Sequence, residues 1–290
     1  MSAPKFVFPN VVRTRGNFSR RCELARHYGC TFVEIPAHFI RGKKEVEKTH
    51  QVPGSIPSRE SIQFLYGGLG PNISPLPYIL HTEAILPGKT PKSRGKIPEL
   101  RWADRQWREC FVKMLCDISD VLGCPAAKIE VHPGLRSNVG LRDILTGVSD
   151  ILETYSKATG NEPEVLLENR TDQRVKNGQD IADIYFLCEQ EYPHILDKFG
   201  IVLDVSQLYT VTGEAFLSSF AQIPDASLRG FHIHTRHLPS NINDDIPWNS
   251  VFERISGLDQ DFIINPELLH ESGVAGMIGF CKELLKSHQI

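Results

Sequence analysis

The sequence predicts a single (β/α)8 TIM barrel, and three observations lead to this fold class. Eight short apolar or β-branched segments recur along the 290 residues, each followed by a longer stretch with helical periodicity, as in a parallel sheet covered by helices. The spacing is about 36 residues per unit, which suits a barrel of typical length with some long loops. No Gly-rich phosphate turn follows the first segment and no change in composition marks a linker, which argues against a doubly wound open sheet. We therefore predict one domain over residues 1–290.

The predicted elements alternate along the whole chain. The strand candidates are apolar or β-branched runs at residues 5–9, 31–37, 77–82, 128–132, 164–169, 200–205, 228–234 and 261–265. The helix candidates have a 3.6-residue apolar period, weakest at 58–66, and cover residues 16–28, 58–66, 100–122, 141–158, 178–191, 213–221, 247–256 and 273–287.

Two predicted loops exceed normal length. They cover about residues 38–57 and 86–100, after the second and third strands, and are rich in Pro, Gly, Lys and Arg. Because the loops after the strands of a barrel all lie on its catalytic face, we expect these two loops to be functional.

The composition excludes several classes of protein. A chain with 41% hydrophobic, 23% charged and 9% aromatic residues is neither disordered nor collagen-like. No apolar run has the roughly 18 residues of a membrane span, and the N-terminal segment lacks the pattern of a secretory signal. The seven cysteines form no C-x-x-C pair, so we expect reduced thiols and a cytoplasmic protein that does not contact membranes.

Metal-binding side chains recur where the predicted strands end, and these ends point into the site of a parallel barrel. They are His81, Glu130, His132, Glu168, Asp204, His232, His234, Asn265 and Glu267. A single histidine at a strand end is most often structural, but imidazoles and carboxylates from six strands form a ligand set for divalent ions such as zinc, manganese or iron. The residues contain no nucleophilic triad.

Such a ligand set is compatible with two reactions. Two ions bridged by Glu168 could activate water for hydrolysis of a phosphodiester. A single ion held by Glu168, Asp204, His232 and Glu267 could instead polarise a sugar carbonyl while carboxylates move a proton, which is isomerisation or epimerisation.

The distribution of basic residues favours a phosphate-bearing substrate such as DNA. The net charge is only −3, yet 17 of the 32 Lys and Arg residues follow predicted strand ends. The candidate substrate contacts are Arg13, Arg15, Arg41, Lys89, Arg136, Arg170, Gln207, His234 and Arg236. The alternative is that these loops are simply solvated and charged.

The strand-end motifs resemble the xylose-isomerase-like barrel superfamily, and most closely the endonuclease IV family of apurinic/apyrimidinic endonucleases. The matching motifs are Tyr-Ile-Leu-His at His81, His-Pro-Gly at His132, Leu-Glu-Asn at Glu168, Val-Leu-Asp at Asp204 and Gly-Phe-His at His232. The resemblance implies a metal-dependent hydrolase of damaged, abasic DNA in which Glu168 and Glu267 are catalytic. It assigns one ion to His81, His132 and Glu168, and a second ion to Glu168, Asp204, His232 and Glu267. Zinc is the ion it implies, with manganese as the alternative.

Several positions depart from the endonuclease pattern. Gln207 stands where the family has a further histidine, Ala84 replaces a tyrosine, and the Asp-x-His pair of a third zinc site is absent from the sequence. In the last strand, Asn265 matches the family's metal-binding glutamate by spacing and Glu267 matches it by chemistry. The sequence does not decide which of the two is the ligand. The resemblance therefore implies one or two ions rather than three. UV-damage endonucleases share the motifs at Glu168 and Asp204, and sugar epimerases share four ligands.

Three functions remain open at this point. The first is an endonuclease-like hydrolase of abasic DNA or a related phosphodiester. The second is a metal-dependent isomerase or epimerase of a sugar or sugar phosphate. The third is a degenerate barrel that binds metal without catalysis, which the departure at Gln207 allows. No protein partner can be inferred.

Overall fold

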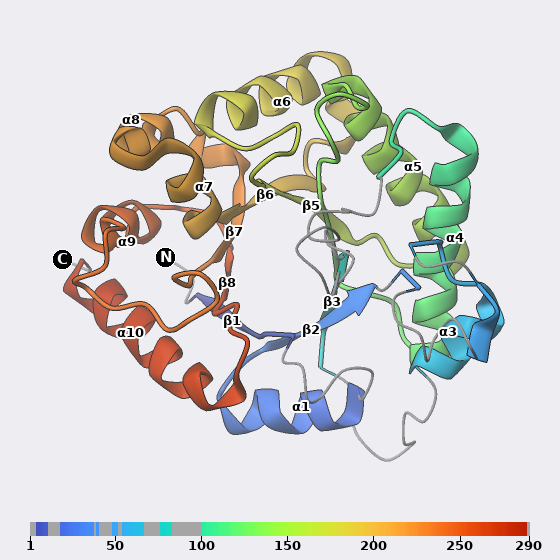
Figure 1. Cartoon of the computed structure of the whole chain (residues 1–290), viewed down its shortest axis with the longest axis horizontal. Helices are drawn as coiled ribbons and strands as arrows, with labels where there is room; N and C mark the ends of the chain where they lie inside the picture. Colours follow the sequence, from blue (N-terminus) through green and yellow to red (C-terminus); the bar gives the residue numbers. More distant parts are fainter. Residues whose placement is uncertain are drawn as a thin grey trace.

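The computed structural model describes residues 4–10, 18–37, 39–40, 48–51, 54–66, 76–82 and 100–288. Eight parallel strands close into a barrel in the order β1 to β8, with β1 paired to β8, and helices surround this ring (Figure 1). The predicted (β/α)8 barrel is therefore confirmed. The strands are β1 (Lys5–Phe8), β2 (Phe32–Ala37), β3 (Tyr78–Thr82), β4 (Lys128–Val131), β5 (Glu164–Glu168), β6 (Phe199–Asp204), β7 (Leu228–His232) and β8 (Ile263–Asn265).

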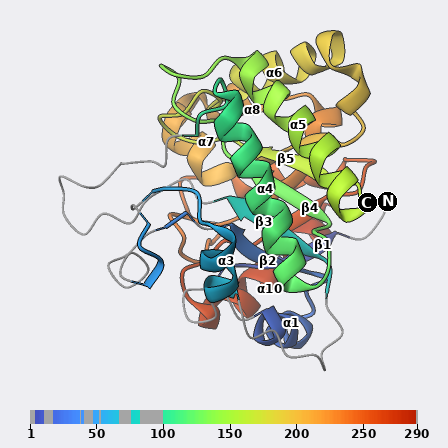
Figure 2. The same cartoon turned by 90° about the vertical axis from the view of Figure 1, so that its right-hand side faces the viewer.

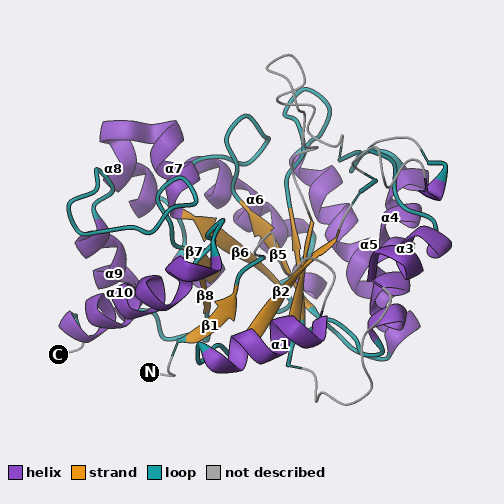
Figure 3. Ribbon diagram, turned by 60° about the horizontal axis from the view of Figure 1, so that its bottom comes forward, coloured by secondary structure: helices purple, strands orange, loops and turns teal. Residues whose placement is uncertain are grey.

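The outer layer consists of helices arranged around the strands (Figure 3). Apolar side chains of these helices are buried in the core. Figure 2 shows α4 and α5 packed side by side over the strands. The helices are α1 (Phe18–His27), α3 (Arg59–Tyr66), α4 (Arg105–Leu122), α5 (Leu141–Thr159), α6 (Gly178–Glu191), α7 (Val205–Thr212), α8 (Phe216–Ala221), α9 (Trp248–Ser256) and α10 (Val274–Ser287). Among the described residues, no helix is long and apolar enough to cross a membrane.

The structure corrects two predicted boundaries and adds one helix. The helix predicted over 100–122 begins only at Arg105, because Asp104 caps it by accepting a hydrogen bond from the Trp107 amide at 3.1 Å. The strand predicted to continue to residue 234 ends at His232. The single helix predicted over 213–221 is preceded by α7, which the sequence prediction missed.

Helix α7 begins directly after the last residue of β6, so it holds the site residue Asp204 in place. Its sequence is rich in β-branched residues with low helix propensity. The helix nevertheless forms, because the carboxylate of Asp204 accepts a hydrogen bond from the Gln207 amide at 2.8 Å and caps the first turn.

The barrel interior has an apolar floor below a polar layer. Five fully buried aliphatic side chains form the floor: Val7, Ile79, Leu166, Val202 and Ile263. Successive inward-facing residues of a strand are two positions apart. The next inward positions on four of these strands are therefore His81, Glu168, Asp204 and Asn265. Polar site residues thus lie directly above a dry, close-packed floor that holds their strands in place.

Most of the two predicted long loops, 38–57 and 86–100, lies outside the described residues. The same is true of four candidate phosphate contacts, Arg13, Arg15, Arg41 and Lys89. Their predicted roles stay predictions.

Candidate metal centre

The first predicted ligand group, His81, His132 and Glu168, comes together at the ends of β3, β4 and β5. The Oε2 atom of Glu168 lies 2.8 Å from Nε2 of His132 and 3.2 Å from Nε2 of His81. All three side chains are buried, and their ligand atoms lie within 4.8 Å of one another. The structure thus brings together the three residues to which the resemblance assigns the first ion.

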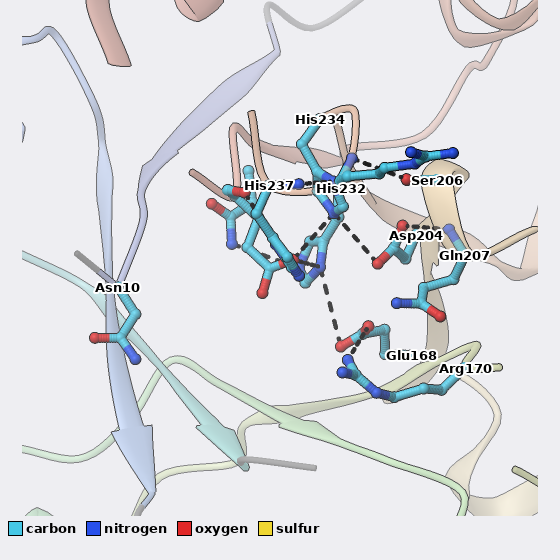
Figure 4. A network of polar contacts seen from close by, with 12 residues as sticks. Asn10, Glu168, Arg170, Asp204, Ser206, Gln207, His232, His234 and His237 are labelled. Carbon is cyan, nitrogen blue, oxygen red and sulfur yellow. Dashed lines mark hydrogen bonds and ion pairs between the residues drawn. The ribbon is translucent and has the colours of Figure 1, made fainter. Parts of the chain in front are cut away.

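A second ligand group shares Glu168. It contains Glu168, Asp204 and His232, whose ligand atoms also lie within 4.8 Å of one another. Figure 4 shows these three side chains converging from their separate strands. The Oε2 atom of Glu267 is 3.6 Å from Nδ1 of His232, so all four predicted ligands of the second ion lie together. Glu168 is the member common to both groups.

The last strand places both Asn265 and Glu267 at the site. The amide of Glu267 donates to the carbonyl of Asn265 at 3.0 Å, which closes a three-residue turn around Pro266. The Asn265 side chain contacts His232 Nε2 at 3.4 Å, whereas Glu267 approaches the other ring nitrogen. The tight turn lets both residues reach the same histidine, so both lie at the site, and the choice of metal ligand between them stays a prediction.

His234 and His237 form a third group with Glu267. The Oε2 atom of Glu267 lies 3.2 Å from His234 Nε2 and 3.4 Å from His237 Nδ1, and His234 Nε2 also lies 3.4 Å from Asp204 (Figure 4). His237 has a positive φ of 59°, as has the preceding residue Arg236 at 52°. Left-handed backbone at two successive non-glycine residues costs free energy, and such strain is concentrated at functional sites.

Two observations on His234 point in opposite directions. Burial disfavours its charged ring, but Asp204 and Glu267 outweigh this effect and raise the pKa of His234 to about 10. The amide of His237, however, donates to Nδ1 of His234 at 3.0 Å, which requires an unprotonated Nδ1. We give priority to this hydrogen bond, because a backbone amide cannot change its role. His234 is therefore a neutral ring, and its Nε2 atom lies beside the two carboxylates without a hydrogen bond to the described residues.

The pKa values of the other site residues are shifted, some upward and some downward. Burial disfavours charged rings at His81 and His232, but nearby glutamates, Glu130 above all, raise both pKa values well above the ordinary range. Burial also disfavours the charged form of Glu168 and Glu267, yet neighbouring histidines hold both pKa values well below the usual one. Burial lowers the pKa of His132. The site is thus built from carboxylates that require a nearby positive charge.

Two further carboxylates lie in the polar layer: Glu130, which the sequence placed at a strand end but assigned to neither ion, and Glu34, which it missed. Glu34 on β2 approaches His81 Nδ1 at 2.5 Å, and Glu130 on β4 approaches His232 Nε2 at 3.1 Å. An acidic residue inside an apolar strand pattern was the available signal. Glu34 interrupts the run 31–37, and Glu130 shares the inward face with His132.

The described candidate phosphate contacts differ in their positions. Arg170 Nη1 lies 3.4 Å from Oε1 of Glu168, and its side chain is only 13% exposed. Gln207 accepts hydrogen bonds from the amide and hydroxyl of Thr171, at 3.1 and 2.6 Å, so its carbonyl oxygen is engaged. Arg136 and Arg236 are exposed in the loops after β4 and β7. Among the described arginines and lysines, Arg170 is the one paired with a predicted metal ligand.

The donor set fits one or more divalent cations. Four of the six predicted ligands keep a buried atom without a hydrogen bond to the described residues: His132 Nε2, Asp204 Oδ2, His232 Nδ1 and Glu267 Oε2. Unpaired buried polar atoms are costly, and a metal ion would satisfy them. Ligands about 2.0–2.1 Å from a tetrahedral ion lie roughly 3.3 Å apart, close to the 3.2 Å between His81 and Glu168. Imidazole and carboxylate donors suit zinc or manganese.

Comparison with known proteins finds solved structures that share the barrel fold of this chain. No family model and no curated protein matches the sequence. Among solved structures, a D-tagatose 3-epimerase-like protein has a TM-score of 0.56 and 16% identity over 98% of both chains. A xylose isomerase domain protein from Salmonella typhimurium has a TM-score of 0.57 and 11% identity over 97% of both chains. An AP endonuclease of family 2 from Brucella melitensis has a TM-score of 0.54 and 12% identity, over 96% of this chain and 99% of that one.

These neighbours confirm the fold that the resemblance implied, that of the xylose-isomerase-like barrels. At such low identity the likeness concerns the fold alone. Sugar epimerases recur among the neighbours beside the AP endonuclease. The fold therefore does not favour the endonuclease over the epimerases, and the site must decide between them.

Proposed function

We propose that this protein is a metal-dependent hydrolase of phosphodiesters, with abasic DNA as the substrate to test first. One observation carries the proposal: Glu168 belongs to two ligand groups, one with His81 and His132 and the other with Asp204 and His232. A carboxylate in that position can bridge two ions. When bound, such a pair would activate water and stabilise the leaving oxygen of a phosphodiester.

His81 and His132 distinguish this proposal from a single-ion reaction. Glu168, Asp204, His232 and Glu267 would already suffice to hold one ion for isomerisation. His81 and His132 add a second set of donors around Glu168, at 3.2 and 2.8 Å. Because burial lowers the pKa of His132, its ring is neutral at physiological pH and its Nε2 is ready to bind a cation.

The side chains around the ligands support an anionic substrate. Arg170 places a guanidinium beside Glu168, where it can pair with a phosphate oxygen. His234 Nε2 lies 3.4 Å from Asp204 and 3.2 Å from Glu267, beside both carboxylates. Exposed Arg136 and Arg236 on neighbouring loops extend the positive charge.

A sugar or sugar-phosphate isomerase is the second candidate, and one geometric observation favours it. Glu168 and Glu267 approach the same ring nitrogen of His232, at 4.0 and 3.6 Å. Two carboxylates beside one ion could remove and return a proton at adjacent carbons. The recurrence of epimerases among the structural neighbours agrees with this candidate.

The test is incubation of metal-loaded protein with a labelled duplex that contains one abasic-site analogue. A parallel sample with a ketohexose is followed by NMR. The proposal predicts cleavage at the lesion that a chelator stops and that Glu168→Gln abolishes. Glu164→Gln is the matched control, because Glu164 is on the same strand but pairs with Lys128 instead of the ligands.

The outcomes separate the three functions. Ketose interconversion without cleavage would replace the hydrolase by the isomerase. Metal binding without either reaction would support the non-catalytic barrel. Equal cleavage by Glu168→Gln and the wild-type protein would exclude a bridging role for Glu168.

A further inference from the structure

A cavity of about 710 Å³ lies beside the metal centre, and none of its lining residues is a predicted metal ligand. The lining includes Ser206, Tyr209, Thr235 and Arg236, which follow β6 and β7 and therefore belong to the catalytic face of the barrel. Sites for small molecules usually have roughly 300–1,000 Å³. The cavity thus has room for an organic group attached to whatever binds at the centre.

A tight turn separates this cavity from the metal centre. Thr235 and Leu238 exchange backbone hydrogen bonds at 3.0 and 2.9 Å, and the two residues between them, Arg236 and His237, have φ of 52° and 59°. This is the pattern of a type I′ turn, which Asn and Gly adopt more readily than Arg or His. The strained turn serves two sites, because His237 contacts Glu267 at the centre whereas Arg236 lines the cavity.

Hydrogen bonds hold the wall of the cavity in a fixed shape. Asp244 accepts from the Thr235 hydroxyl at 2.7 Å and from the Asn241 amide at 2.9 Å. The Arg236 amide donates to the Ser206 hydroxyl at 3.3 Å, which ties the turn to the first residues of α7. A wall that is ordered before the ligand arrives loses little conformational entropy when the ligand binds.

Several groups of the lining remain available to a ligand. The guanidinium of Arg236 and the hydroxyl of Tyr209 make no hydrogen bond or ion pair with the described residues. The Tyr209 ring is half-buried and packs near Phe216, with ring centroids 5.9 Å apart. Asn243 and Asp245 are exposed and add an amide and a carboxylate. The cavity therefore offers a cation, an aromatic ring, and hydrogen-bond donors and acceptors.

A nucleotide carries the groups that complement this lining. Its base stacks on aromatic rings, its base and sugar both donate and accept hydrogen bonds, and its phosphate pairs with arginine. Inorganic phosphate would leave the ring and the carboxylate unused, and a sugar phosphate would leave the ring unused. Because consecutive Cα atoms lie about 3.8 Å apart, a ligand group at Arg236 can be joined directly to a phosphodiester at His237 and the centre.

We propose that the cavity binds the nucleoside next to the scissile phosphodiester, with its base against Tyr209 and a phosphate at Arg236. This nucleoside still carries its base when the lesion itself is abasic. The inference rests on the proposed function and adds which part of the substrate the protein recognises beside the reacting bond.

The test is an NMR titration of the metal-free, full-length protein with deoxyadenosine monophosphate, in the presence of a chelator. Deoxyribose phosphate is the matched probe without a base. We expect the nucleotide to bind about 10-fold or more tightly than the sugar phosphate, which is the usual contribution of stacking on an aromatic ring. Equal affinity for the two probes would overturn the assignment of the cavity to a nucleoside.

Variants identify the residues that bind the nucleotide. Arg236→Gly removes the guanidinium but suits the left-handed backbone of the turn, and Tyr209→Leu removes the ring but keeps an apolar side chain. Each should weaken nucleotide binding by about 10-fold or more. Arg142→Ala, which changes an exposed arginine paired with Glu191, should bind as the wild-type protein does. Wild-type affinity in Arg236→Gly and Tyr209→Leu, with folding checked by circular dichroism, would overturn the proposal.

The titration is separable from the test of the hydrolase, because it uses neither metal nor turnover. Duplex cleavage that requires Glu168, combined with no nucleotide binding in the titration, would overturn this inference and leave the proposed function intact. Nucleotide binding that Arg236→Gly removes, combined with no duplex cleavage, would support the cavity assignment and overturn the proposed function.

Discussion

Glu168 Oε2 and His132 Nε2 lie 2.8 Å apart, and neither side chain is exposed to solvent. Burial keeps the pKa of His132 low, while burial at Glu168 is overcome by its histidine neighbours, which hold the pKa of Glu168 low. His132 Nε2 makes no hydrogen bond to the described residues, and a neutral imidazole this close to a carboxylate forms a pair that a cation stabilises. This contact explains why we place the metal centre around Glu168.

Arg170 is expected to contribute to substrate binding. Its guanidinium lies beside Glu168, where a substrate phosphate would accept a charge-assisted hydrogen bond. Losing such a bond should raise KM for the duplex by roughly 10- to 100-fold, with a smaller change in kcat. The measurement is steady-state cleavage by Arg170→Ala. Arg142→Ala serves as the control, because Arg142 pairs with Glu191 in an exposed contact away from the site. An unchanged KM in Arg170→Ala would exclude this role.

The metal-free protein should lose stability as pH rises. The pKa values of His81 and His232 are raised above the ordinary value of about 6.5 in the unfolded chain. The charged rings therefore stabilise the fold fully below pH about 6.5, and this stabilisation is lost as pH rises through the raised native pKa values. We expect a lower Tm at pH 9 than at pH 6 in the presence of a chelator. Added zinc should remove this difference in Tm. An equal Tm at pH 6 and pH 9 in the presence of the chelator would contradict this account.

The sequence predicts the fold and most of the centre because both depend on strand periodicity. His81, Glu168 and Asp204 each lie two positions after an apolar residue of the barrel floor on the same strand. The alternation of a strand therefore predicts that they face the interior at the strand end. Glu34 was missed because it lies within a strand whose sequence pattern is otherwise apolar, and Glu130 was listed at a strand end without being assigned to an ion. Helix α7 was missed because its residues disfavour a helix and the cap at Asp204 outweighs that preference.

His237 could not be placed from sequence for a different reason. Its position depends on a turn with two left-handed residues, which no glycine marks in the sequence. The tight turn at Pro266, which brings both Asn265 and Glu267 to the site, likewise could not be read from the sequence.

Two glycine substitutions should change stability in opposite directions. A Cβ at Gly147 in α5 would lie 2.3 Å from the buried Trp102 ring, so Gly147→Ala should destabilise the protein by about 1–3 kcal/mol. A Cβ at Gly276 in α10 meets nothing within 4 Å, so Gly276→Ala should stabilise by about 0.5–1 kcal/mol. Urea unfolding of both variants measures these shifts. A gain in stability from Gly147→Ala would show that α5 packs differently against Trp102.

The cysteines should react at very different rates. Burial raises the pKa values of Cys30 and Cys188 to about 12, whereas Cys110 is exposed. Because the thiolate is the reactive form, we expect Cys110 to be alkylated first at pH 8 and the buried thiols only after unfolding. Peptide mapping by mass spectrometry identifies the modified residue. Modification of Cys188 at the rate of Cys110 in the native protein would contradict the burial described above.

The central claim is that Glu168 joins two ions, and metal stoichiometry tests it most directly. Purified metal-free protein is titrated with zinc by calorimetry, and bound metal is counted after gel filtration, for the wild-type protein and for Glu168→Gln and Glu164→Gln. We predict two ions per chain in the wild-type protein and in Glu164→Gln, and at least one ion fewer in Glu168→Gln. A wild-type protein that binds a single ion, with the same stoichiometry in Glu168→Gln, would contradict the two-ion centre and transfer support to the isomerase.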